Sequence, residues 1–201
     1  MRQAFLVAVM ALCMLSACTS LPPVPAGVHP QPWHNGPGWF SSTCSPWGFS
    51  GKLGVRYHHH GTVALIEWEQ QISSWDLDLS GPLNQNPIHV HGEKDRVQLQ
   101  DASGRIWEAP EPDSLIQRVS GAKLPVSSLL DWLKGRPHRA GAQIWRDADQ
   151  NLAGMIDAPY QILYSQYHPE GQVNVPHRIE IFGPHLHLTL IVRVWTLSSQ
   201  C

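Results

Sequence analysis

The chain has 201 residues, of which 42% are hydrophobic and 15% are charged. Its 14 lysines and arginines nearly balance 16 aspartates and glutamates. This balance excludes a polybasic nucleic-acid binder, because such proteins bind largely by neutralising phosphates. The apolar content excludes a disordered chain and indicates a sizeable core within one domain. Nine tryptophans and twelve histidines are more than a chain of this length needs.

The first residues have the layout of a bacterial lipoprotein signal peptide. An apolar run over residues 4–15 is shorter than the roughly 20 residues of a membrane-spanning helix. It leads into Leu15–Cys18 (LSAC), which resembles a lipobox. The resemblance implies that residues 1–17 are removed and that Cys18 is acylated; an ordinary signal peptide is the alternative. Thr19, in place of the aspartate that retains lipoproteins in the inner membrane, favours the outer membrane.

Two cysteines remain after Cys13 leaves with the signal peptide and Cys18 is acylated. These are Cys44 and Cys201, and an oxidising compartment would permit a disulfide between them. Two unpaired thiols are the alternative. The sequence has no C-x-x-C motif, so redox catalysis has no support.

Residues 18–46 are rich in proline, glycine and serine, which disfavours a regular helix or a central strand. We interpret them as the lipidated cysteine and a tether that is extended where prolines cluster. Residues 47–201 then form the folded domain. Trp33 and Trp39, within the tether, could pack on the domain or lie at the membrane surface.

Residues 47–109 alternate between apolar and polar side chains, as half-buried antiparallel strands do. The clearest alternating segments are 49–57, 64–68, 75–79 and 97–99. Turn-forming residues separate the segments, and Asp101–Gly104 (DASG) is a hairpin signal. The pattern predicts a meander of about six strands with a tryptophan-rich inner face.

Residues 110–135 predict two short helices inserted between strands. The first begins near Pro112 and ends at Gly121, and the second is capped by Pro125–Ser128 and ends at Gly135. Strand patterns resume at 143–146, 160–167, 177–182 and 185–197. The whole predicts a mainly β domain with one curved sheet or open barrel.

Histidines are the first candidates for chemistry. His58–His60 is a triple, and two further pairs share a strand face, namely His89 with His91 and His185 with His187. Such pairs can chelate zinc or copper. However, the triple falls in a predicted turn without an acidic or thiol ligand, and the pairs lie opposite the core face. We therefore expect a solvated outer face and no metal site.

Catalytic motifs are missing from the sequence. There is no G-x-S-x-G, no H-E-x-x-H, no P-loop and no G-x-G-x-x-G. Carboxylates do pair on outward strand faces, as Glu67 with Glu69 and Asp76 with Asp78. Such pairs could serve acid–base chemistry, but surface charge opposite a core face is their commoner cause. We expect neither a catalytic residue nor a cofactor.

The apolar inner face must either be filled by side chains or leave a cavity. Small barrels covered by a helix often bind apolar ligands inside. A second hint is Leu83, a large apolar residue in the polar turn Gly81–Gln85. An exposed leucine is ordinary by itself.

Four stretches, together with the lipobox, resemble the LolB family in order and spacing. They are Gly51–Arg56 (GKLGVR), Ile66–Gln71 (IEWEQQ), Leu77–Leu83 (LDLSGPL) and Leu124–Pro137, which reads L-P-x-x-x-L-x-x-W-L-x-G-x-P. The resemblance covers residues 47–137. It implies an incomplete antiparallel barrel, here of about ten to eleven strands, whose hydrophobic interior is partly covered by short helices.

The resemblance also implies a function in lipoprotein transport. The expected protein is a monomer, lipid-anchored in the outer membrane and facing the periplasm. It would accept acylated lipoproteins from a LolA-like carrier and insert them into the inner leaflet of that membrane, without a cofactor or nucleic acid. The alternative is a structural or lipid-sensing lipoprotein with a solid core.

The resemblance assigns roles to particular residues. By position, Leu83 is the exposed leucine of the family's membrane-insertion loop. The family commonly has glycine where this chain has Asn84, although asparagine also tolerates left-handed backbone. Strand parity predicts the residues that line the acyl-chain cavity. They are Ile66, Trp68, Trp75, Leu77, Leu79, Leu129, Trp132 and Leu133.

Overall fold

The computed structural model describes residues 21–36, 38–40, 44–199 and 201. The predicted signal peptide and the acylation of Cys18 lie outside these residues. Twelve strands form one antiparallel sheet in the order β1-β8-β9-β10-β11-β12-β2-β3-β4-β5-β6-β7. In chain order the strands are β1 (Gln31–Pro32), β2 (Trp47–Tyr57), β3 (His60–Gln70), β4 (Ser74–Ser80), β5 (Ile88–Glu93), β6 (Arg96–Gln100), β7 (Ile106–Ala109), β8 (Gln143–Arg146), β9 (Leu152–Asp157), β10 (Tyr160–Glu170), β11 (Val173–Gly183) and β12 (Leu186–Leu197).

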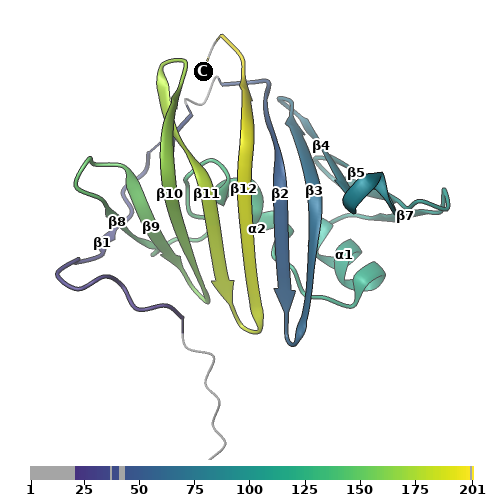
Figure 1. Ribbon diagram of the computed structural model, residues 1–201, viewed down its shortest axis with the longest axis horizontal. Coiled ribbons are helices and arrows are strands. Elements are labelled where there is room, and N and C mark those ends of the chain that lie inside the picture. The colour runs from purple at the N-terminus through teal and green to yellow at the C-terminus, as the bar shows by residue number, and fades with distance from the viewer. Residues whose placement is uncertain (1–20, 37, 41–43, 200) are drawn as a thin grey trace, which may run out of the picture.

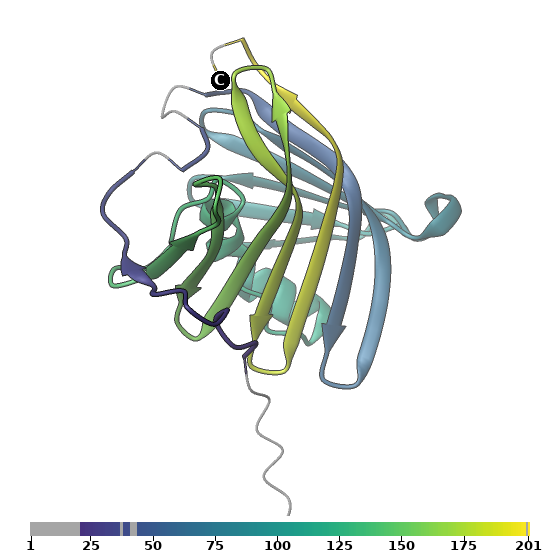
Figure 2. The same ribbon diagram turned by 60° about the vertical axis from the view of Figure 1, so that its left-hand side comes forward.

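The sheet curls around two helices, α1 (Pro112–Ser120) and α2 (Val126–Trp132), as Figures 1 and 2 show. Because β1 and β7 form its two edges, the barrel is open. The prediction of a mainly β, open antiparallel barrel with two short helices is confirmed. The sheet has twelve strands in place of ten to eleven, because it also includes the two-residue β1 and the unpredicted β9.

Strand β9 is hidden from the sequence pattern because both of its faces are covered. Leu152 and Met155 are buried, and so are Gly154 and Asp157. A Cβ atom on Gly154 would lie 2.0 Å from the ring of Trp145, which packs flat over that glycine. An apolar–polar alternation cannot develop where a glycine and a carboxylate occupy buried positions.

Helix α1 ends at the predicted glycine, whereas α2 ends at Trp132, three residues before the predicted Gly135. Gly121 follows α1 with a φ of 74°, and Gly135 follows α2 with a φ of 71°. Both values lie in the left-handed region that favours glycine after a helix. Leu115 of α1 and Trp132 of α2 are almost fully buried against the sheet. Helix α2 begins three residues before the predicted start at Leu129, because Val126 and Ser128 are already buried.

Part of the segment interpreted as a tether packs on the domain. Strand β1 pairs with β8, and the Trp39 amide donates a hydrogen bond to the Lys134 carbonyl at 3.0 Å. The Trp39 ring meets that of Tyr164 edge-on at 4.9 Å, so it packs on the domain. Phe40 is buried, and Cys44 forms a disulfide with Cys201.

Candidate functional site

The eight predicted cavity residues lie together on the concave side of the sheet. In β3 and β4, Ile66 faces Leu79 and Trp68 faces Leu77 across the ladder. Ile66, Trp68, Trp75, Trp132 and Leu133 are buried in the hydrophobic core, and Leu77, Leu79 and Leu129 are partly buried and pack against that core. The strand parity assumed from the sequence is therefore the one the structure has. That these residues hold acyl chains stays a prediction.

Aromatic stacking fills this region. The Trp68 ring lies parallel to the Trp75 ring with centroids 5.1 Å apart, and Phe49 continues the stack at 6.4 Å from Trp68. Trp75 in turn packs over Gly92, where a Cβ atom would lie 2.1 Å from the indole. Side chains therefore fill this part of the interior.

A buried carboxylate holds the helical cover. Oδ2 of Asp157, a residue 1% exposed, accepts hydrogen bonds from Trp132 Nε1 at 2.8 Å and from the His138 amide at 2.7 Å. The Tyr164 hydroxyl donates to the Trp132 carbonyl at 3.0 Å. Sequence reasoning missed Asp157, since an aspartate before Ala158-Pro159 is typical of an exposed turn. Asp157 thus fastens the end of α2 to β9.

Replacing Asp157 with alanine is expected to lower the free energy of unfolding by about 2–4 kcal/mol. The Trp132 indole N–H and the His138 amide would lose their acceptor in a site closed to water, and each such loss costs about 1–3 kcal/mol. Urea unfolding measures the change. Asp78→Ala, which removes a carboxylate 58% exposed, is the control and should cost under about 0.5 kcal/mol. Equal effects of the two substitutions would contradict the role of Asp157.

The interior disfavours charge. Burial raises the pKa of the Tyr164 hydroxyl well above its usual range, and it lowers the pKa of the Lys134 ammonium. Lys134 Nζ lies 5.9 Å from the centre of the Trp47 ring. Both shifts follow from removal of the charged form from water.

Leu83 lies on a loop that projects from the convex side of the sheet (Figure 2). The loop contains a single 3₁₀ turn, η1 (Pro82–Asn84), and the Gly81 amide donates to the Gln85 carbonyl at 2.7 Å. Leu83 is 91% exposed. Leu83 and Asn84 have φ values of 61° and 58°, so Asn84 adopts the left-handed backbone that glycine would otherwise provide.

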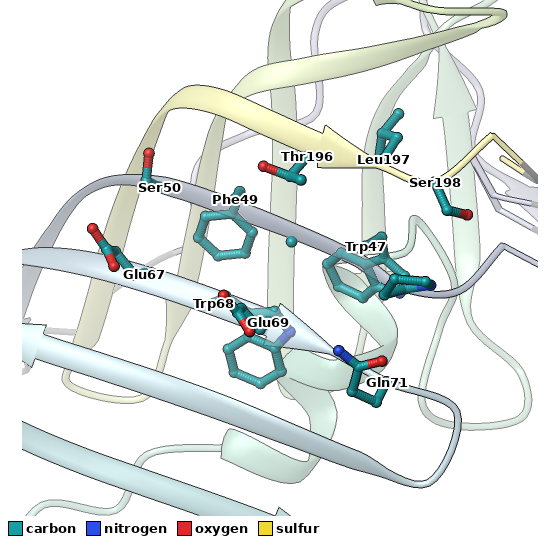
Figure 3. A pocket seen from close by; sticks show the side chains of 12 residues that line it. Trp47, Phe49, Ser50, Glu67, Trp68, Glu69, Gln71, Thr196, Leu197 and Ser198 are labelled. Atoms are coloured by element: carbon teal, nitrogen blue, oxygen red, sulfur yellow. The ribbon is translucent and has the colours of Figure 1, made fainter.

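A hollow of about 380 Å³ lies where β2 begins and where β3 and β12 end (Figure 3). Of the predicted cavity residues, Trp68 alone lines it. Its other walls come from both faces of the sheet, and they include Trp47, Phe49, Glu67, Glu69 and Thr196. The sequence did not predict this hollow. Gly48 is one of its lining residues, and a single glycine in a strand pattern does not indicate a pocket.

The histidines singled out in the sequence, at 58–60, 89, 91, 185 and 187, lie on the outer face and at turns. His89 Nδ1 lies 2.8 Å from Asp78 Oδ1, and His91 Nδ1 lies 2.7 Å from Asp76 Oδ1. The hydrogen bond with Asp76 raises the pKa of His91. Within the described ranges, no group of three or more histidine, cysteine, aspartate or glutamate side chains is arranged to hold a metal ion. Among those same residues, no helix has the length and hydropathy needed to cross a bilayer.

Comparison with known proteins identifies the family. The family described as Outer membrane lipoprotein LolB matches residues 45–195, which run from the start of β2 to most of β12 and leave out only β1 of the described strands. The chain belongs to the LolB family. A relative from Pseudomonas paraeruginosa PA7, named Outer-membrane lipoprotein LolB, is 30% identical over 199 residues and 97% of each chain. One of the same name from Pseudomonas fluorescens Pf-5 is 31% identical over 150 residues, covering 74% of this chain and 73% of its own.

Solved structures support the fold assignment. A putative outer membrane lipoprotein-sorting protein domain from Vibrio parahaemolyticus superposes with a TM-score of 0.51 at 9% identity. The match covers 82% of this chain and 88% of that one. At this identity the similarity shows the fold alone. With its LolB relatives, the chain is a lipoprotein-localisation factor of the outer membrane, lipid-anchored and facing the periplasm.

Proposed function

We propose that this LolB-family chain accepts acylated lipoproteins from a LolA-like periplasmic carrier and inserts them into the inner leaflet of the outer membrane. One observation carries the proposal most directly. An apolar, tryptophan-rich concave face lies beneath two short helices, while Leu83 stands exposed on a projecting loop. The first feature suits acyl chains in transit, and the second suits entry into a bilayer.

The transfer needs no covalent step. Each acyl CH₂ exposed to water costs about 0.8 kcal/mol, so chains move readily between apolar sites and rarely into solvent. The carrier, the interior of this chain and the bilayer would form a series in which the bilayer is the final acceptor. Acyl chains on Cys18 would hold the protein at that acceptor.

Acceptance requires the interior to open. Helix α2 contributes Leu129 and Trp132 to the predicted lining, and Trp132 is fastened through Asp157. Outward movement of α2 would withdraw Leu129 and Trp132 from the core that also holds Trp68 and Trp75, and would open the interior to an incoming chain. The closed arrangement protects those rings from water when no cargo is present.

The rival reading is a structural or lipid-sensing lipoprotein with a solid core. An apolar fluorophore distinguishes the two. We expect the purified protein to enhance its fluorescence and a triacylated lipoprotein to reverse the enhancement. The same lipoprotein without acyl chains is the control and should have no effect. A protein that leaves the fluorophore dark, or a fluorophore that acylated cargo never displaces, would favour the structural reading.

A further inference from the structure

The outer face of the β2–β3 hairpin carries apolar side chains that no strand covers. Val63 is 60% exposed and Leu65 is 39% exposed. Across the ladder, Val63 faces Gly54, which has no side chain to cover it. On the other side, β4 ends at Ser80 opposite Leu65, so Val63 has no partner there. Two adjacent aliphatic residues are thus open to solvent.

Two basic residues flank these aliphatic side chains on the same face. Lys52 lies directly opposite Leu65, and Arg56 lies two residues beyond Gly54. Both are exposed, and neither forms an ion pair with a carboxylate in the described part of the chain. We call Lys52, Arg56, Val63 and Leu65 the apolar–basic surface. Arg56 Nη2 lies 3.1 Å from His187 Nδ1. Aliphatic groups beside exposed cations are the combination that binds lipid interfaces.

The same face changes character along the strands. Beyond Leu65, Glu67 lies opposite Asp78 and Glu69 lies opposite Asp76. Like charges placed directly opposite one another are unfavourable. An anionic surface would attract the half of this face that carries Lys52 and Arg56 and would repel the half that carries these carboxylates. This difference defines an orientation of the protein on such a surface.

The apolar–basic surface is continuous with the loop that bears Leu83. The turn η1 contacts β3, and Figure 2 shows η1 projecting on the side toward which the outer face of β2 and β3 is turned. The predicted acylation site, Cys18, lies three residues before Leu21, the first described residue, which is a reach of about 10 Å.

We propose that the apolar–basic surface docks on a bilayer containing anionic phospholipids and, with Leu83, sets the orientation of the protein on the membrane. The inference rests on the proposed function, because it takes Cys18 as the anchor and Leu83 as the insertion residue. The acidic half of the face is held away from the lipid. The docked protein meets the bilayer at two places, the loop and the β2–β3 hairpin.

Site-specific fluorescence on the full, acylated protein tests this docking. A polarity-sensitive label is placed on Val63→Cys in vesicles of phosphatidylethanolamine and phosphatidylglycerol. We expect blue-shifted emission and quenching by spin-labelled lipid. The matched control is Val194→Cys, which is 55% exposed and lies opposite Ser50 on β12, toward the other end of the strands from Val63, and its label should remain in water. The native Cys44 and Cys201 are joined in a disulfide and do not take the label.

Charge removal supplies the second arm. Lys52→Gln and Arg56→Gln should each lower the ratio of docked to undocked protein about fivefold, as expected for one cation near an anionic surface. If the labels at positions 63 and 194 both remain in water while a label on Leu83→Cys is quenched by lipid, the docking surface is overturned and the proposed function stands. No quenching at either 63 or 83 would count against both. Protection of position 63 that appears when the carrier protein is added, and not with lipid, would assign the surface to a protein partner and overturn the proposal.

Discussion

Replacing Leu83 with glutamate is expected to block delivery of lipoproteins into a bilayer while leaving acceptance from the carrier intact. The side chain is 91% exposed, so its loss removes almost no packing and should change the free energy of unfolding by under about 0.5 kcal/mol. A carboxylate in place of an aliphatic side chain makes entry into the apolar part of a bilayer about 3 kcal/mol less favourable. That difference corresponds to a loss of about a hundredfold in delivery to the bilayer.

Ile72 offers a matched control for this substitution. It is 92% exposed in the turn between β3 and β4, away from the η1 loop. Delivery of a fluorescent acylated lipoprotein from carrier to liposomes would be followed for Leu83→Glu and Ile72→Glu in parallel. We expect the second variant to deliver cargo normally. Unchanged delivery by Leu83→Glu, or equal loss in both variants, would refute the role of the loop.

Removing the disulfide between Cys44 and Cys201 is expected to destabilise the domain more than any other single change. The bond closes a loop of 157 residues. In the chain-entropy account, such a crosslink stabilises the folded state by about 5 kcal/mol. At roughly 2–4 °C per kcal/mol for a chain of this size, Cys44→Ser should lower Tm by about 10–20 °C. Thermal unfolding followed by circular dichroism measures the shift.

The double variant Cys44→Ser with Cys201→Ser provides the internal check. Because both substitutions remove one bond, the double variant should unfold at nearly the same temperature as either single variant. The wild-type protein in excess reductant should match them. Additive losses from the two substitutions, or a single variant as stable as the wild type, would contradict a stabilising disulfide.

The strand faces could be predicted from the sequence because one side of each strand is buried. The alternation of Ile66 and Trp68 with Glu67 and Glu69 leaves a single reading of which side meets the core. The helix ends could be predicted for a similarly local reason, since Gly121 adopts a backbone that other residues avoid.

Other features depend on contacts between distant segments and leave no local pattern. Asp157 appears polar in the sequence, yet it is buried by Trp132, 25 residues away. Proline-rich residues around β1 read as a tether, yet β8 accepts them as an edge strand, where prolines are tolerated. The filling of the interior by the Phe49–Trp68–Trp75 stack likewise depends on three strands together. Composition alone left a cavity and a solid core equally open.

The proposed function places two demands on the same side chains, which are to stabilise the fold and to receive acyl chains. The tryptophans that would receive acyl chains also pack the core when cargo is absent. Opening of this cover would have to break the hydrogen bonds to Asp157 and withdraw the buried Trp132 from the core. The long strands β2, β3, β11 and β12 retain their ladder in either state.

Transfer of cargo from the carrier to membrane vesicles tests the account most directly. A periplasmic carrier loaded with a triacylated fluorescent lipoprotein would be mixed with vesicles that bear the acylated chain, and the cargo recovered with the vesicles would be measured over time. We predict that the cargo moves to these vesicles without added nucleotide and stays with the carrier when the vesicles lack the chain. Cargo that remains on the carrier in both cases, or reaches bare vesicles equally fast, would contradict a role in accepting and inserting lipoproteins.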